Sequence, residues 1–208
     1  MTSAALTSLT DFALAAETLI FAALVLRRPK QRFSAAWYWG GTMLLLGIGA
    51  LMGGIDHGVF EPAHWPRYGI QRGNWVVLGA MTFCLLMTIG QQFFPPGLRR
   101  VLPAIATAQF AVDTVAVLTI DSFLDVVLNY APVMLLLLAM SIAGLRNGSG
   151  SQAMIAGIVV LFTASGIQAA GVDTFTPLDH NGLYHVVSMA GVALLYRGGL
   201  RLRTECEP

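Results

Sequence analysis

Three histidines stand where a metal site can form inside a membrane: His57 ends one apolar segment, and His180 and His185 open the last one. Imidazole is a good zinc ligand, and three protein ligands leave the fourth position of a tetrahedral ion free for water. The ion lowers the pKa of that water and polarises a carbonyl group, while a nearby carboxylate takes the proton. The pattern therefore predicts a zinc site with His57, His180 and His185 as ligands.

Carboxylates that can accept this proton occur in the second, fourth and fifth apolar segments. Asp56 precedes His57, Asp113 lies within the fourth segment, and Asp125 is close to the start of the fifth. We predict that these three aspartates supply the catalytic acid or base. Further polar residues of the apolar segments are expected to line the same pocket: Glu17, Asn129, Gln168, Asn181, Tyr184 and Ser188.

The composition indicates which elements must position these side chains. Of the 208 residues, 56% are apolar and only 11% are charged, and the mean hydropathy is +0.69. These values are typical of an integral membrane protein and exclude an ordinary soluble domain. A helix needs about 20 mainly apolar residues to cross a bilayer. The sequence predicts seven such spans, forming one all-α domain over residues 1–208: 8–26, 36–60, 75–93, 101–120, 123–144, 152–171 and 182–200.

The positive charges indicate an orientation. Ten of the twelve lysines and arginines fall in the loops and tail on one side of the predicted spans, and Arg67 and Arg72 fall on the other. The positive-inside rule then places the N-terminus outside and the C-terminus in the cytoplasm. We expect the plasma membrane, which in a bacterium is the inner membrane. The net charge of +1 gives no sign of a nucleic-acid partner, so membrane lipid is the partner expected.

Sorted by depth, the candidate site residues all fall in the outer half of the predicted bundle. A charged side chain costs about 2.5–3.5 kcal/mol at the centre of a membrane helix, and such residues usually mark sites or pathways. A one-sided cluster favours a pocket that opens outward over a transport path, which would carry polar groups along its whole length. A proton-coupled carrier is therefore the least favoured function.

Whether His180 and His185 can bind the same ion depends on where the last helix begins. Asp179 is expected to cap this helix. Asn181, His185 and Ser188 then lie on one stripe of the helix. His180 converges with His185 only if it lies in the non-helical segment before the first turn.

The arrangement resembles the CREST superfamily of seven-helix membrane hydrolases, which includes alkaline ceramidases, progestin and adipoQ receptors, and a group of GPI-remodelling proteins. His57, late in the second span, matches the first histidine of that family, and His185 in Leu183-Tyr184-His185 matches the last. The resemblance implies zinc-dependent cleavage of a lipid amide or ester in an outward-facing pocket. The sequence departs from the family at three points: Gly53 replaces its serine, Asn181 replaces its first histidine in helix seven, and the third span lacks its aspartate.

Two other classes of function stay open. A receptor or binding protein for a lipid or small apolar ligand would use the same polar cluster to satisfy the head group. A haem protein would use His57 and His185 as axial ligands from opposing helices. Retinal bound as a Schiff base is excluded, since the only lysine, Lys30, lies in an inner loop.

Overall fold

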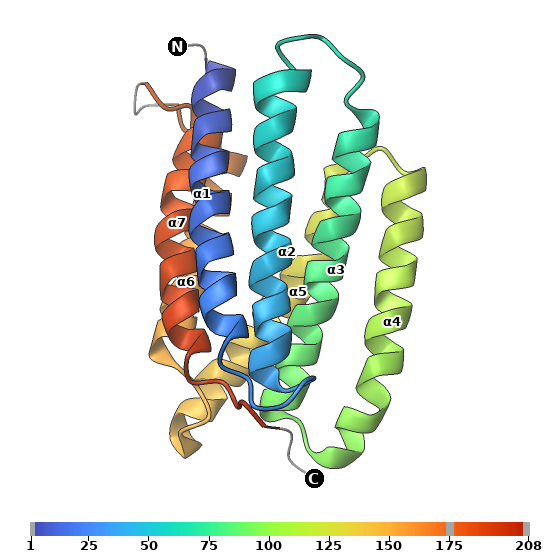
Figure 1. The fold of residues 1–208 in the computed structure, drawn as a ribbon, viewed down its shortest axis with the longest axis vertical. Helices are drawn as coiled ribbons and strands as arrows, with labels where there is room; N and C mark the ends of the chain where they lie inside the picture. Colours follow the sequence, from blue (N-terminus) through green and yellow to red (C-terminus); the bar gives the residue numbers. More distant parts are fainter. Residues whose placement is uncertain (1–2, 174–176, 206–208) are drawn as a thin grey trace.

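The computed structural model of the chain describes residues 3–173 and 177–205, and this part is built from helices. Seven α-helices run alternately up and down one bundle, with the chain ends at opposite ends of it (Figure 1). Their bounds are α1 Ser3–Leu26, α2 Ala35–Ile55, α3 Tyr68–Phe93, α4 Pro96–Thr119, α5 Phe123–Gly144, α6 Gln152–Ala169 and α7 His180–Gly199. A π-helical turn, Asp56–Phe60, continues α2, and a 3-10 turn, Leu145–Asn147, follows α5.

The predicted helices are confirmed, and most of their bounds agree within a few residues. The largest difference is α3, which begins at Tyr68 rather than near residue 75. Hydropathy did not predict this extension because the first two turns of α3 contain polar residues. Arg72 holds these turns in place: it is buried and donates to the carbonyl oxygens of Val117 and Ile120 at the end of α4.

Six helices in the described part of the chain, α1 to α6, are long and apolar enough to cross a membrane. α7 has 20 residues and is not one of the six. Polar residues near both of its ends, from His180 to Arg197, lower its hydropathy. The seventh crossing therefore stays a prediction.

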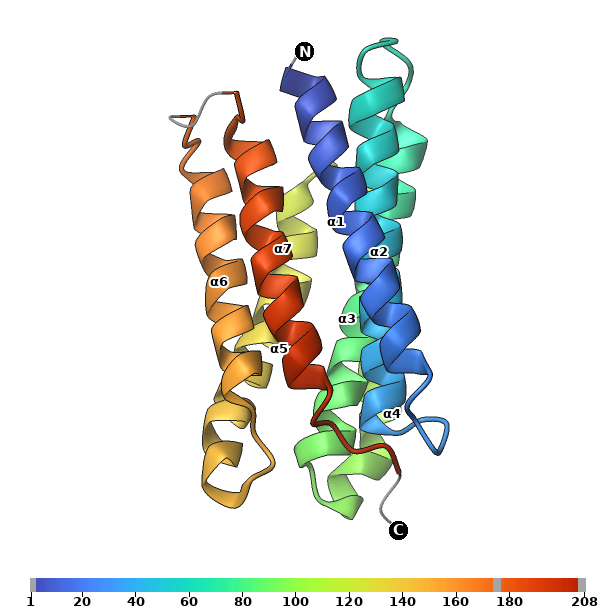
Figure 2. The same cartoon turned by 60° about the vertical axis from the view of Figure 1, so that its left-hand side comes forward.

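Six of the helices form a ring, and α4 lies outside it (Figures 1 and 2). α1 packs on α2 and α7, α2 packs on α3, and α3, α5, α6 and α7 follow in that order around the ring. α4 contacts α3 and α5. α3 is the most buried of the six candidate spans, with 56% of its most apolar stretch buried against 22–33% in the other five.

Glycines let α1 and α2 approach closely. Gly40, Gly47 and Gly54 recur every seven residues along one side of α2. A Cβ at any of them would lie within 2.8 Å of an α1 side chain, as it would at Gly58 in the π turn. The opposing residues are Leu26, Leu19, Phe12 and Ser8 respectively. This seam fixes the rotation of α1 and thereby the direction of its polar face.

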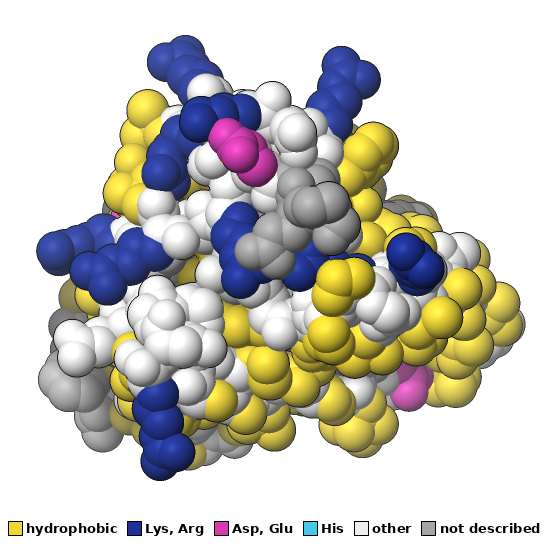
Figure 3. Space-filling view, turned by 90° about the horizontal axis from the view of Figure 1, so that it is seen from below, with side chains coloured by type: hydrophobic (Ala, Val, Ile, Leu, Met, Phe, Trp, Pro, Cys, Tyr) yellow, Lys and Arg dark blue, Asp and Glu magenta, His cyan; other side chains and the backbone are white. Residues whose placement is uncertain are grey.

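In the described part of the chain, buried charge is confined to one half of the bundle, and most of the largest buried apolar side chains lie in the other half. The largest fully buried side chains, such as Trp39, Met43 and Ile89, lie toward the C-terminal end. The C-terminal end itself is rich in lysine and arginine, which Figure 3 shows from below. The buried ionisable side chains of the described residues all lie toward the N-terminal end: Asp11, Asp56, Arg72, Asp113 and His185.

Candidate functional site

A pocket of about 260 Å³ opens at the N-terminal end of the bundle, between the π turn, α3 and the first residue of α5. We call it the α2–α3 pocket. Its lining combines polar residues with apolar and aromatic ones: Met52, Gly53, Asp56, His57, Arg67, Ile70, Gln71, Asn74, Trp75 and Phe123. The wide π turn carries Asp56 and His57, and such turns are frequent at functional sites.

Asp56 and Arg67 form the charged wall of this pocket. Arg67 donates two parallel hydrogen bonds to Asp56, from Nε to Oδ1 and from Nη2 to Oδ2, both 2.7 Å long. Gln71 Nε2 adds a third donor to Asp56 Oδ2 at 3.3 Å. The hydrogen bonds to Asp56 raise the pKa of Arg67 above its ordinary value. Since Asp56 is buried and Arg67 satisfies it bidentately, the pair forms a rigid, locally neutral surface.

Unused hydrogen-bonding capacity lies deeper in the pocket. Asn74 Oδ1 is buried without a hydrogen-bond partner. His57 joins Glu61 through Nδ1 at 2.7 Å, so its Nε2 is left for another contact. Buried polar groups in proteins are nearly always paired. The Asn74 oxygen is therefore an acceptor that a ligand with an N–H or O–H group would satisfy.

His185 occupies a separate, closed site between α1 and α7. The Thr10 hydroxyl donates to the Thr7 carbonyl oxygen at 2.8 Å, and its oxygen also lies 3.0 Å from His185 Nδ1. His185 Nε2 lies 3.1 Å from Asp11 Oδ1. Both side chains are buried, and the ring of Tyr184 covers His185 at 5.1 Å between centroids.

His180 belongs to a third cluster, at the exposed start of α7. Its ring Nδ1 and its backbone N–H both contact Asp173 Oδ1, at 2.8 and 2.7 Å. The side-chain hydrogen bond with His180 is the main reason that the pKa of Asp173 is lowered. Asp179 caps α7 as predicted, accepting from the Gly182 N–H at 2.8 Å. Desolvation opposes ionisation of Asp179, but the bonds from Gly182, Ser3 and Thr7 leave its pKa lowered.

The remaining predicted site residues form pairs between helices. Gln109 Nε2 donates to Asn129 Oδ1 at 2.8 Å, and Gln168 Nε2 donates to Asn181 Oδ1 at 3.0 Å. Ser188 is buried on α7, three residues beyond His185. Three further predicted residues each have a carboxyl oxygen that is buried without a hydrogen-bond partner: Glu17, Asp113 and Asp125.

The predicted zinc ligands are not brought together. His57, His180 and His185 each contact a different carboxylate, on Glu61, Asp173 and Asp11. Among residues 3–173 and 177–205, no three His, Cys, Asp or Glu side chains lie close enough to hold one metal ion. These residues do not fit zinc in this arrangement. The zinc centre, and the catalytic roles of Asp56, Asp113 and Asp125, stay predictions without geometric support.

Residues 6–204 match the sequence model of a family described as "Family of unknown function (DUF6962)". The chain belongs to the DUF6962 family. No curated protein matches this DUF6962 chain. No solved structure matches it either.

Several residues of the DUF6962 site were not predicted from the sequence. Asp11 was missed because it lies close to the start of the first apolar segment, and its position opposite His185 depends on how the helices pack. Arg67, Gln71 and Asn74 were missed although their spacing of four and three residues places them on one helical face. That stripe was the signal that could have located the pocket wall.

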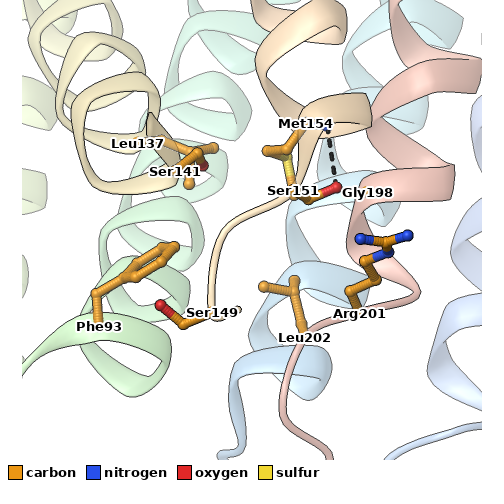
Figure 4. Close-up of a pocket in the computed structure, with 9 residues that line it drawn as sticks. All are labelled: Phe93, Leu137, Ser141, Ser149, Ser151, Met154, Gly198, Arg201 and Leu202. Carbon is orange, nitrogen blue, oxygen red and sulfur yellow. Dashed lines mark hydrogen bonds between the residues drawn. The ribbon is translucent and has the colours of Figure 1, made fainter. Parts of the chain in front are cut away.

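A second hollow lies near the C-terminal end of the DUF6962 bundle (Figure 4). Its volume is about 10 Å³, which is near the minimum for one water molecule. Its lining includes Phe93, Ser141 and Arg201. This hollow is too small for an organic ligand, so the α2–α3 pocket is the better candidate site.

Proposed function

We propose that this protein is a seven-span protein of the plasma membrane that binds the polar head of a lipid in the α2–α3 pocket. Its N-terminus lies outside and its C-terminus in the cytoplasm. Ligand pockets are mostly apolar with a few placed polar groups. The observation that carries the proposal is the lining of the pocket, which combines the Asp56–Arg67 pair and Asn74 with Trp75 and Phe123.

The charges of the pocket favour a neutral or zwitterionic head group. Asp56 and Arg67 already neutralise each other, and Arg67 also contacts Glu61, so this wall offers no free cation to an anionic head group. Asn74 Oδ1 offers an acceptor to an ammonium or hydroxyl group of the ligand. Trp75 and Phe123, with ring centroids 6.0 Å apart, offer an aromatic surface to the adjoining apolar part.

Binding fits the arrangement better than metal-dependent hydrolysis or haem ligation. Both of those functions need histidines that converge on one ion, whereas His57 and His185 are engaged by different carboxylates. A lipid head needs only the contacts that the pocket wall already presents. Zinc-dependent hydrolysis of a lipid amide or ester is therefore the alternative against which binding is tested.

The test is native mass spectrometry of the protein purified in mild detergent from its own membranes. Asn74→Leu removes the free acceptor while breaking no hydrogen bond, and Gln152→Leu, on the exposed start of α6, is the matched control. A lipid should co-purify with the wild type and with Gln152→Leu and be depleted in Asn74→Leu. Equal lipid in all three proteins would refute binding in this pocket. About one zinc per chain, lost in His185→Ala, would favour the hydrolase instead.

Orientation is tested by labelling introduced cysteines in whole cells. Ala63→Cys lies in the exposed α2–α3 connection, and Arg146→Cys lies in the exposed α5–α6 connection. The background is Cys206→Ser, at a position outside the described residues. A membrane-impermeant thiol reagent should label Ala63→Cys but not Arg146→Cys. The reverse pattern would invert the proposed orientation.

A further inference from the structure

Two polar stripes meet where α4 packs on α5. Gln109 and Asp113 lie one turn apart on α4, and Asp125 and Asn129 lie one turn apart on α5. The hydrogen bond from Gln109 to Asn129 fixes the register of this antiparallel hairpin. One turn toward the connecting loop, the same register sets Asp113 opposite Asp125.

Both carboxyl groups have an oxygen that lacks a hydrogen-bond partner. Asp113 is 6% exposed, and its Oδ2 is buried without a partner. The oxygen lies against α3 at Gly79, where a Cβ would clash with it. Oδ2 of Asp125 is likewise buried and unpartnered, and the two carboxylates are close enough to interact electrostatically. Two facing carboxylates in an apolar bundle repel each other unless a cation or a shared proton joins them.

The buried arginine of the described residues, Arg72, does not neutralise Asp113 and Asp125. Arg72 is the one buried Lys or Arg side chain in residues 3–173 and 177–205. Its guanidinium pairs with Asp121 at 2.8 Å and donates to two carbonyl oxygens at the end of α4. It also lies over the rings of Tyr68 and Trp75, at 4.8 and 4.5 Å. Arg72 is thus committed to fastening α3 to α4.

We propose that Asp113 and Asp125, together with the side-chain amide oxygens of Gln109 and Asn129, bind a hard divalent cation of the Ca²⁺ class. All four groups offer oxygen, which is the ligand atom such ions prefer, and the two carboxylates match a charge of +2. Gln109 donates through its nitrogen, so its own oxygen is free for the ion. Water molecules complete the coordination.

Position in the fold allows an ion to enter this site. Asp125 is the third residue of α5 and only partly buried, next to the loop that joins α4 to α5. Figure 1 shows this loop at the same end of the bundle as the N-terminus. The site is distinct from the α2–α3 pocket, whose lining includes the contacting rings of Trp75 and Phe123. Trp75 is one turn from Gly79 on α3 and can report on a bound ion.

The experiment uses the full chain, purified in detergent and freed of metal by a chelator. Ca²⁺ binding is measured by isothermal titration calorimetry, and Tb³⁺ binding by luminescence excited through tryptophan. We expect one site per chain, with affinity reduced at least about tenfold in Asp113→Asn and in Asp125→Asn. Glu17→Gln is the matched control, because this carboxyl group also has a buried oxygen without a partner but lies on α1, away from the α4–α5 hairpin. Its affinity should stay within about twofold of the wild type.

Two results would overturn the cation site. One is unchanged affinity in both asparagine variants, with circular dichroism showing that they are folded. The other is a wild type that binds neither ion while both asparagine variants melt at a higher temperature. That second result would mean that the two carboxyl groups share a proton instead of a metal. Neither result depends on whether a lipid occupies the α2–α3 pocket.

Discussion

Replacing His185 by leucine would leave the Asp11 carboxylate buried without its partner. Oδ2 of Asp11 already lacks a hydrogen bond, and Oδ1 would lose the contact with His185 Nε2. Both side chains are at most 9% exposed, so water cannot replace the missing partner. Removing one member of a buried pair costs about 3–5 kcal/mol. We expect His185→Leu to lower the free energy of unfolding by about 3 kcal/mol.

The double variant Asp11→Leu/His185→Leu separates the pair from simple packing. Replacing both members of a buried pair by apolar residues of similar volume is often close to neutral. The loss in the double variant should therefore be smaller than the sum of the single losses, by about 2 kcal/mol. Unfolding is followed in mixed micelles by titration with a denaturing detergent, using far-ultraviolet circular dichroism.

The control for this cycle is Glu17→Leu, which removes a different carboxylate from the same helix. No hydrogen bond joins Glu17 Oε2 to any described residue, so its effect should add to that of His185→Leu within about 0.5 kcal/mol. If the Asp11/His185 cycle is also additive within that margin, the two residues are not coupled and our interpretation of the α1–α7 site is wrong.

Three further predictions concern packing and pH. Gly54→Ala would bring a Cβ within 2.8 Å of the Phe12 ring and should lower the free energy of unfolding by about 1–3 kcal/mol, measured in the same assay. Gly166→Ala meets nothing within 4 Å in α6 and should instead raise that free energy by up to about 1 kcal/mol, and a loss there would contradict the open space. The pKa of Asp179 is lower in the folded state, so its contribution is fully present above the ordinary pKa of aspartate and is lost as pH falls through the folded value. Asp179→Ala should therefore destabilise the protein at neutral pH by about 1 kcal/mol through loss of the cap on the Gly182 N–H, and wild type and variant should converge in acid.

Local features of the site followed from the chain alone. The cap at Asp179 was predicted because Asp179 follows Pro177 at the start of an apolar run, and a cap needs only the next turn of its own helix. Gln109 and Asp113 share one helical face, as do Asp125 and Asn129, because a spacing of four residues is nearly one turn. The gathering of buried charge at one end also followed from the sequence. Charged groups inside a membrane are costly, so each one is informative wherever it occurs.

Contacts between helices did not follow in the same way. His57 and His185 were predicted as partners in one metal site, yet His57 pairs with Glu61 on the next turn and His185 pairs with Asp11 on α1. Which residues meet depends on the rotation of each helix, and the glycine seam at Gly47 and Gly54 sets that rotation for α1. The glycine repeat can be recognised in the sequence of α2, but the sequence does not show which helix packs against it.

The sequence by itself determined the long apolar helices, the uneven placement of charge and the cap of α7, because hydropathy, helix periodicity and capping act within a turn or two of one segment. Only the tertiary structure decided that α4 lies outside the ring and that Asp113 faces Asp125. It also decided that the three histidines lie in three separate clusters. These outcomes depend on the order of the helices around the bundle and on close packing between residues far apart in the chain, and no single segment encodes them.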